Sequence, residues 1–308
     1  MMIEPISILL IGLALLLIGS NLLITTTENV AQKFSISGFY ASFFMIGIAT
    51  SAPEIFISIE SALQNETILA IGNSLGSNIS NIAIVFCISI LFMRGELSKN
   101  DLPIRPYISM VILTIFSFLL MFFDEHLDAK DSFVLITVFI LSIYYFESQD
   151  GKKSANSHNS SSLIVTLFYL VLSVVMLIFG SIYFIDSATQ IAITLGVSTY
   201  IIGLTLAALG TSLPELAASI QSARKGRLDF IVGNIIGSNL FNIAVAMSLA
   251  GIISSSDINS YELLRDILML GLCTLTFFLI IRSNSIFRTV YSVALVITYF
   301  LYIILIFK

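Results

Sequence analysis

Two copies of one segment, 161 positions apart, dominate this sequence. Residues 42–83 align with residues 203–244 without a gap, and each copy places a glutamate in the middle of an apolar run, Glu54 in the first and Glu215 in the second. A segment that recurs at a fixed offset indicates that one structural unit is used twice in the fold. We therefore expect two related halves built around this pair of acids. Other shared positions include Thr50 and Thr211, Ser51 and Ser212, Pro53 and Pro214, Gly72 and Gly233, Asn73 and Asn234, Gly76 and Gly237, Ser77 and Ser238, Asn78 and Asn239, and Asn81 and Asn242.

Apolar runs of membrane-spanning length make up most of the chain. Hydrophobic residues account for 57% of the sequence and charged residues for 11%, against about 25% charged residues in a typical soluble domain. The first run follows Glu4 and has neither a basic leader nor a cleavage signal, so we expect a membrane helix there rather than a signal peptide. Because a membrane-crossing helix needs roughly 20 mostly apolar residues, the sequence predicts an all-α integral membrane protein with ten transmembrane helices. The ten runs are 5–26, 37–63, 67–93, 106–123, 132–146, 163–187, 198–223, 229–254, 264–282 and 287–307.

A polar segment at residues 147–162 divides the ten runs into two groups of five. Its Ser, Asn, Lys and Gly residues are typical of a flexible linker, and it separates a first repeat, residues 1–146, from a second, residues 163–308. Because each half has an odd number of spans, the second half must enter the membrane from the opposite side. Two inverted five-helix repeats of this kind are typical of secondary transporters.

The basic residues gather on one side when successive loops are assigned alternately to the two faces of the membrane. Of the 14 Lys and Arg residues, 11 then lie on one side, and 3, namely Lys130, Arg265 and Lys308, lie on the other. Cytoplasmic loops carry the excess of Lys and Arg. We therefore expect a multi-pass plasma-membrane protein with a cytoplasmic linker and with both termini extracytoplasmic.

Several other classes of function lack support in the sequence. A net charge of −5 leaves no broad basic surface for nucleic acid. Cys87 and Cys273 lie inside apolar runs, where small core residues are more common than a disulfide or a metal pair. His126 and His158 lie in polar connections, where a solvated side chain is the ordinary state. We expect no prosthetic group, no obligate protein partner and no enzymatic activity.

Glu54 and Glu215 have no Lys or Arg near the middle of any predicted span to balance their charge. An acid at mid-bilayer depth costs about 2.5–3.5 kcal/mol, so protons, a bound cation or a water-filled cavity must offset it. Two protonated structural residues are the alternative interpretation. We favour metal cations, because a symmetry-related pair of acids surrounded by hydroxyl groups is not expected by accident.

Oxygen-bearing groups surround both glutamates. On a helix, Thr50 and Ser51 share a face with Glu54, and Pro53 frees backbone carbonyls one turn earlier; the second copy repeats this pattern. An all-oxygen cage with two negative charges suits Ca²⁺, or several Na⁺ ions, and without His or Cys it does not suit Zn²⁺ or Cu⁺. The next span of each half adds a stripe of oxygens at a spacing of four, made of Asn73, Ser77 and Asn81 in the first half and of Asn234, Ser238 and Asn242 in the second.

Glycines interleaved with these stripes form the pattern Gly-x-x-x-Gly in both halves, at Gly72 and Gly76 and at Gly233 and Gly237. This pattern predicts close packing of helices in membranes. Such packing would bring the oxygen stripes to the glutamates.

The motifs ATSAPE (49–54) and GTSLPE (210–215), with GNSLGSNISN (72–81) and GNIIGSNLFN (233–242), resemble the two alpha-repeats of the calcium/cation antiporter superfamily, and prokaryotic sodium/calcium exchangers most closely. The resemblance implies exchange of Ca²⁺ for Na⁺, with the first and sixth helices sliding against the rest to alternate access. Transferred position by position, it implies a metal site made of Glu54, Glu215, Thr50, Ser51, Thr211, Ser212, Ser77, Ser238, Asn81 and Asn242, with the backbone of Gly47 and Ala208.

The sequence departs from the family pattern at Ala49, where glycine is usual, and in having Asn at both 81 and 242, where some exchangers have one acid. Exchange of cations for H⁺ stays open as an alternative. A passive cation channel is less well supported, because an inverted repeat around a central cage favours alternating access over a through pore. An intramembrane hydrolase is less well supported still, because Ser51 and Ser212 have no His or Lys base at membrane depth.

Overall fold

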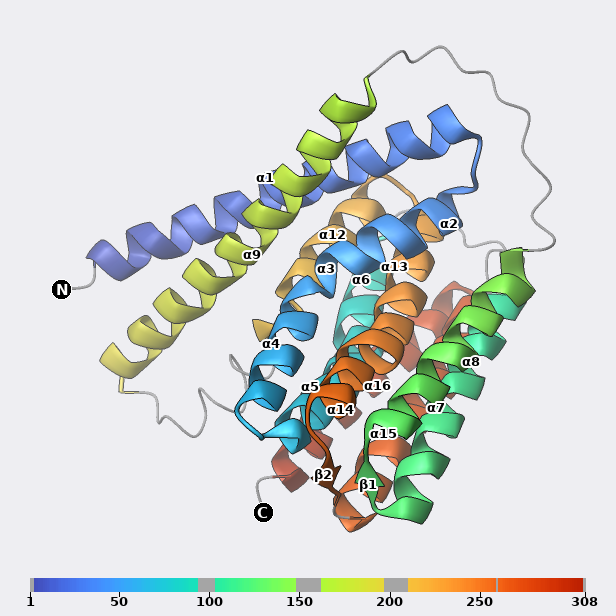
Figure 1. Ribbon diagram of the computed structural model, residues 1–308. Coiled ribbons are helices and arrows are strands. Elements are labelled where there is room, and N and C mark those ends of the chain that lie inside the picture. Colours follow the sequence, from blue (N-terminus) through green and yellow to red (C-terminus); the bar gives the residue numbers. More distant parts are fainter. Residues whose placement is uncertain (1–2, 94–102, 148–161, 197–209, 259, 307–308) are drawn as a thin grey trace.

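The computed structural model describes residues 3–93, 103–147, 162–196, 210–258 and 260–306, and this part of the chain is almost entirely helical (Figure 1). The elements of the first half are α1 (Ile3–Phe34), α2 (Gly38–Ala41), the π-helical segment η1 (Ser42–Ile46), α3 (Gly47–Thr50), α4 (Ala52–Leu63), α5 (Thr67–Ser80), η2 (Asn81–Phe86), α6 (Cys87–Phe92), α7 (Ile104–Asp124), β1 (His126–Leu127) and α8 (Ala129–Glu147). Those of the second half are α9 (Leu163–Thr194), α12 (Leu213–Arg224), α13 (Leu228–Phe241), η4 (Asn242–Met247), α14 (Ser248–Ile253), β2 (Ser256–Asp257), α15 (Ser260–Arg282) and α16 (Ser285–Ile306).

The sequence repeat is also a repeat of local structure. The bounds of α4, α5, η2 and α6 recur 161 positions later as those of α12, α13, η4 and α14. Even the short π-helical segment recurs, and it begins at the asparagine that ends each oxygen stripe, Asn81 in one half and Asn242 in the other. The aligned segments therefore fold in the same way.

Seven helices or helix pairs in the described residues are long and apolar enough to cross a membrane: α1, α5–η2–α6, α7, α9, α13–η4–α14, α15 and α16. Residues 38–50 and 52–63 form an eighth candidate span, which is bent by 44° at Ser51. The predicted span at 198–223 lies partly outside the described residues, so the count of ten stays a prediction. An all-helical membrane protein is nonetheless the observed fold class.

Helices α1 and α9 form a close pair beside the rest of the bundle (Figure 1). A Cβ added at Gly12 would meet the backbone N of Phe184 at 2.6 Å, and one added at Gly180 would meet the backbone N of Leu16 at 2.9 Å. Glycine at these positions thus allows the two backbones to touch. The outward face of the pair is apolar: only 17% of the most apolar window of α9 is buried.

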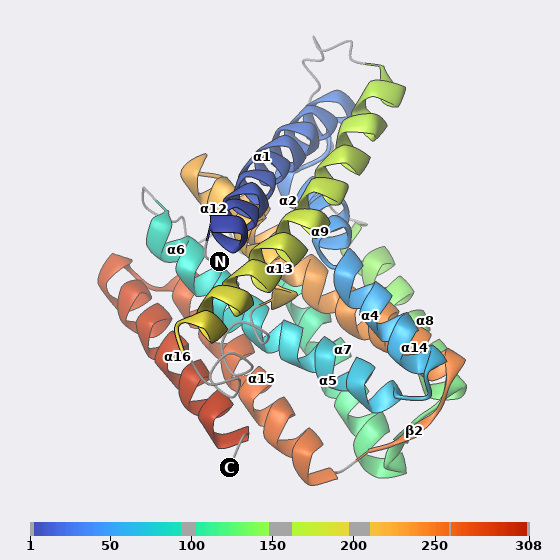
Figure 2. The same cartoon turned by 90° about the vertical axis from the view of Figure 1, so that its left-hand side faces the viewer.

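Helices α5 and α13, each with the π-helical and α-helical segments that follow it, form the centre of the bundle. In Figure 2, α5 and α13 lie between the α1–α9 pair and helices α15 and α16. Their most apolar windows, including the following π and α segments, are 78% and 83% buried. Cys87 and Cys273 are buried, free cysteines near this core, as the sequence predicts.

The predicted glycine packing is confirmed in one half only. A Cβ at Gly233 or Gly237 would meet a backbone oxygen, of Phe39 or Phe43 respectively, at 2.6 Å. At Gly72 and Gly76, by contrast, no atom of the described residues lies within 4 Å of an added Cβ. Residues 200 and 204, which correspond to Phe39 and Phe43 at the offset of 161, lie outside the described residues, so close packing at Gly72 and Gly76 stays a prediction.

Candidate cation-binding site

Each glutamate lies just after a break in its helix. Helix α3 ends at Thr50 and α4 begins at Ala52, with Ser51 between them at φ −82° and ψ 3°. Ser212, before α12, has almost the same geometry, with φ −85° and ψ 7°. The proline that follows has no N–H and is tolerated in the first turn of the new helix. In both halves, a residue outside regular helical geometry thus precedes the proline.

The breaks place both carboxyl groups in the first turn of a helix at the centre of the molecule. Glu54 in α4 and Glu215 in α12 each have an exposed fraction of 0%. The positive end of a helix dipole favours a carboxylate at this position. None of the ion pairs among the described residues involves either glutamate. A negative charge on either glutamate therefore needs a positive partner that these side chains do not supply.

Hydroxyl groups from one half surround the glutamate of the other half. Thr211 lies beside the carboxyl group of Glu54, and Thr50 and Ser51 lie beside that of Glu215. The two carboxylates are also close enough to repel each other. The structure thus brings the two motifs into one crossed arrangement.

The predicted serines on α5 and α13 join this arrangement through hydrogen bonds. Ser77 Oγ donates to Glu54 Oε1 at 3.4 Å and lies 3.4 Å from the hydroxyl of Thr211. Ser238 Oγ lies 3.3 Å from the hydroxyl of Thr50 and donates to the backbone oxygen of Gly47 at 3.4 Å. The serine of α5 therefore reaches Glu54 directly, whereas the serine of α13 reaches Thr50 and Gly47 of the first motif.

Six buried oxygens of the predicted ligand residues have no hydrogen-bond partner among the described residues. They are the hydroxyl of Ser51, Oε2 of Glu54, both carboxyl oxygens of Glu215, and the Oδ1 atoms of Asn81 and Asn242. A buried acceptor without a donor costs free energy, about 1–3 kcal/mol for a neutral group and more for a charged one. A cation that accepts these lone pairs would remove that cost.

The remaining predicted ligands differ in burial and in their hydrogen bonds. Gly47 and Ser212 are buried, and Ser212 Oγ lies 2.6 Å from Ser80 Oγ. Thr211 is partly exposed, whereas Ala208 lies outside the described residues. Asn234, a residue of the second oxygen stripe, donates from Nδ2 to Ser219 Oγ at 2.9 Å, and its Oδ1 accepts from the hydroxyl of Thr50.

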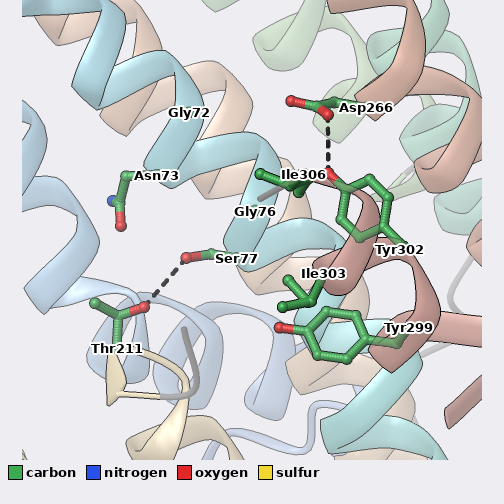
Figure 3. Close-up of a pocket in the computed structure, with 10 residues that line it drawn as sticks. All are labelled: Gly72, Asn73, Gly76, Ser77, Thr211, Asp266, Tyr299, Tyr302, Ile303 and Ile306. Carbon is green, nitrogen blue, oxygen red and sulfur yellow. Dashed lines mark hydrogen bonds between the residues drawn. The ribbon is translucent and has the colours of Figure 1, made fainter. Parts of the chain in front are cut away.

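A cavity lies next to Ser77 and Thr211. Within the described residues it has a volume of about 240 Å³ and is open on one side. Figure 3 shows Ser77 and Thr211 facing each other at one side of it, and the carboxylate of Asp266 bound to the hydroxyl of Tyr302 at another; Tyr302 Oη donates to Asp266 Oδ1 at 2.8 Å. The other lining residues are Gly72, Asn73, Gly76, Tyr299, Ile303 and Ile306.

Three residues near the site were not assigned a role from the sequence: Ser80, Asn78 and Asn239. The side chains of Asn78 and Asn239 connect α5 with α13 and contact Asn242 and Asn81, respectively. Both asparagines belong to the repeated triplet Gly-Ser-Asn, which is the signal that could have identified them.

The donor set of the site is made only of oxygen atoms. Two carboxylates supply two negative charges, and amide, hydroxyl and backbone oxygens supply neutral ligands. Such a set matches hard cations such as Ca²⁺, which takes six to eight oxygen ligands at about 2.3–2.6 Å. Within the described residues, no His or Cys contributes to the site that would favour a softer metal.

Comparison with known proteins identifies the family. The family described as sodium/calcium exchanger protein matches residues 5–146 and 165–308. The chain belongs to the sodium/calcium exchanger family. It is therefore a membrane antiporter and not an enzyme, and the superfamily expected from its motifs is confirmed.

Several known proteins align with most of the chain. The inner membrane protein YrbG of Escherichia coli is 27% identical over 295 residues, which cover 91% of this chain and 89% of that protein. The sodium/calcium exchanger MaX1 of Methanosarcina acetivorans is 29% identical and covers 80% of this chain and 82% of its own. A solved structure of the sodium-calcium exchanger NCX_Mj, soaked with 2.5 mM Na⁺ and 1 mM Sr²⁺, has a TM-score of 0.81 at 26% identity, covering 100% of this chain and 99% of that one.

Proposed function

We propose that this protein exchanges Ca²⁺ for Na⁺ across the membrane by alternating access. The observation that carries the proposal is the group of buried, unpaired oxygens on Glu54, Glu215, Asn81 and Asn242. Two carboxylates balance the charge of one Ca²⁺ or of two Na⁺ ions, so the two cargoes can replace each other in one site. Because Asn81 and Asn242 cannot ionise, a third Na⁺ would leave the loaded site one charge positive.

The proposed ligands of the transported ions are the residues implied by the motifs. The carboxylates supply the charge, and the amide oxygens of Asn81 and Asn242 supply neutral ligands. The hydroxyls belong to Thr50, Ser51, Thr211, Ser212, Ser77 and Ser238. The backbone oxygen of Gly47 completes the set, together with that of Ala208, its counterpart at the offset of 161.

The proposed topology is ten transmembrane helices in two inverted repeats of five, in the plasma membrane, with both termini extracytoplasmic. The close glycine contacts between α1 and α9 support movement of these two helices as one unit. Sliding of this unit past the central helices would open the site to one side and then to the other.

Uptake of radioactive Ca²⁺ into proteoliposomes tests the proposal. Vesicles loaded with Na⁺ should accumulate Ca²⁺ when diluted into Na⁺-free medium, whereas a pH gradient alone or the absence of any gradient should give little uptake. Uptake driven by H⁺ instead would favour the H⁺-coupled alternative. Rapid equilibration of Ca²⁺ without any counter-ion would indicate a channel.

A further inference from the structure

Two asparagines that are not predicted to be ligands tie the two central helices together. Nδ2 of Asn78 donates to the backbone oxygen of Asn239 at 3.1 Å, and Nδ2 of Asn239 donates to the backbone oxygen of Asn78 at 3.3 Å. Their exposed fractions are 0% and 1%. Each asparagine thus donates its NH₂ group to a backbone oxygen of the helix in the other half.

This use of the donor fixes which way each amide faces. A carboxamide has an acceptor oxygen and a donor NH₂ on groups of similar shape, so its orientation is set by its partners. With Nδ2 of Asn78 committed to a backbone oxygen, Oδ1 of Asn78 is free to accept, and it accepts from Nδ2 of Asn242 at 3.1 Å. In the same way, Oδ1 of Asn239 accepts from Nδ2 of Asn81 at 3.2 Å.

The chain of hydrogen bonds ends at the two proposed ligand asparagines. Because Asn81 and Asn242 have their NH₂ groups occupied, each directs Oδ1 elsewhere. Both of these oxygens are buried and have no hydrogen-bond partner among the described residues. If either amide were turned around, it would present N–H groups, which repel a cation, in place of an oxygen.

We propose that Asn78 and Asn239 are positioning residues, each of which holds the ligand asparagine of the opposite half with its oxygen toward the transported cations. The inference rests on the proposed function, because it requires Asn81 and Asn242 to bind the cargo. The pairing is crossed: Asn78 of α5 orients Asn242, and Asn239 of α13 orients Asn81. This crossing is the feature that an experiment can test.

The test measures Na⁺-driven Ca²⁺ uptake against Ca²⁺ concentration for Asn78→Leu, in which the side chain keeps the same branched shape and loses its hydrogen-bonding groups. A net hydrogen bond contributes about 0.5–1.5 kcal/mol, so the KM for Ca²⁺ should rise roughly two- to thirteenfold. Since KM does not depend on the amount of folded protein, reduced yield does not imitate this effect. If the leucine variant gives no folded protein, Asn78→Ala replaces it.

The double variant with Asn242→Asp distinguishes positioning from general packing. A carboxylate has two equivalent oxygens and needs no orientation, so the ratio of KM values caused by Asn78→Leu should fall to about 1 or below when residue 242 is Asp. The same Asn242→Asp change should leave the effect of Asn239→Leu intact, whereas Asn81→Asp should abolish it. These two crossed cycles serve as controls for each other.

Two outcomes would overturn the inference: an unchanged KM in both leucine variants, or an increase that persists at the same ratio in the matching aspartate backgrounds. Failure of the proposed function is recognised separately, because the parent would then show no Na⁺-driven Ca²⁺ uptake. In that case the same cycles are measured with whichever cation the parent carries, and the same ratios decide.

Discussion

At the scale of single residues, the proposed site makes the charge of each glutamate the property on which transport should depend most. Glu54→Gln and Glu215→Gln keep the size and polarity of the side chain and remove one of two charges. Loss of one partner of a buried charge interaction costs about 3–5 kcal/mol, so Ca²⁺ uptake at a fixed, subsaturating Ca²⁺ concentration should fall by at least about 100-fold. Proteoliposome flux at matched protein amounts provides the measurement.

The matched control is Glu60→Gln, on the same helix as Glu54 but exposed. It should transport Ca²⁺ at the rate of the parent. Comparable flux in Glu54→Gln and Glu60→Gln would remove Glu54 from the site.

The sequence pointed to the charged and hydroxyl residues of the candidate site because they are unusual inside apolar runs. It did not reveal how the asparagines divide their roles, since Asn78 and Asn81 are three positions apart on one helix and have the same chemistry. What separates them is the partner of each NH₂ group: a backbone oxygen for Asn78 and the side chain of Asn239 for Asn81. Such a difference depends on tertiary contacts and not on spacing.

At the scale of helices, the apolar runs predicted the cores of the elements better than their ends. The run at 5–26 belongs to a helix that continues to Phe34, and the run at 163–187 to one that continues to Thr194. The extension of α1 is polar, and its ion pairs join it to a distant part of the chain. Hydrophobic periodicity cannot predict such pairs. Glu28 in this extension accepts from Lys225 at 3.0 Å and from Arg227 at 3.1 Å, in the turn between α12 and α13.

This ion-pair cluster predicts a salt-dependent contribution to stability. The side chains of Glu28, Lys225 and Arg227 are 22–30% exposed, and pairs of this kind contribute about 0.2–1 kcal/mol each. Glu28→Gln should therefore lower the melting temperature of the detergent-solubilised protein by a few degrees at low salt, and by less in about 1 M salt, where the Debye length is short. The exposed Glu66 provides the control, because Glu66→Gln should not change the melting temperature. An equal decrease at both salt concentrations would argue against an electrostatic origin.

The contact between α1 and α9 gives a second prediction at this scale. An alanine at Gly180 would place its Cβ 2.9 Å from the backbone N of Leu16 and 3.0 Å from the backbone oxygen of Gly12, and neither atom can move aside without shifting a helix. Overpacking of this kind costs about 1–3 kcal/mol, so Gly180→Ala should lower thermal stability and slow exchange. Gly271, for which no described atom lies within 4 Å of an added Cβ, is the control. Gly271→Ala should be neutral or slightly stabilising, because alanine favours a helix over glycine by about 1 kcal/mol. Equal behaviour of the two variants would show that the α1–α9 contact tolerates separation.

At the scale of the whole molecule, the two halves share their sequence pattern but not all of their contacts. Asn234 donates to Ser219, whereas the counterparts Asn73 and Ser58 each have a buried polar atom without a hydrogen-bond partner among the described residues. The repeat could be found from sequence, but these differences could not, because identical residues at identical spacing give the same prediction for both halves.

The orientation of the molecule in the membrane leads to the last prediction. Loop alternation assigns the linker at 147–162 to the cytoplasm, with most of the Lys and Arg residues, and assigns the turn at 64–66 to the outside. The antiparallel pairing of β1 with β2 agrees with this alternation, because it brings together two loops, after α7 and after α14, that are both assigned to the outside.

Single cysteines at Asn156 and Asn65 test the assignment with a membrane-impermeant thiol reagent. The native Cys87 and Cys273 are fully buried, so they should react little and the parent serves as the blank. Asn65→Cys, in an exposed turn, should react in intact cells. Asn156→Cys should react only after the membrane is permeabilised. The reverse pattern would mean that the molecule is inverted, with both termini in the cytoplasm. Reaction of both cysteines in intact cells would mean that the number of spans between positions 65 and 156 is even. An even number would contradict the five-helix repeat.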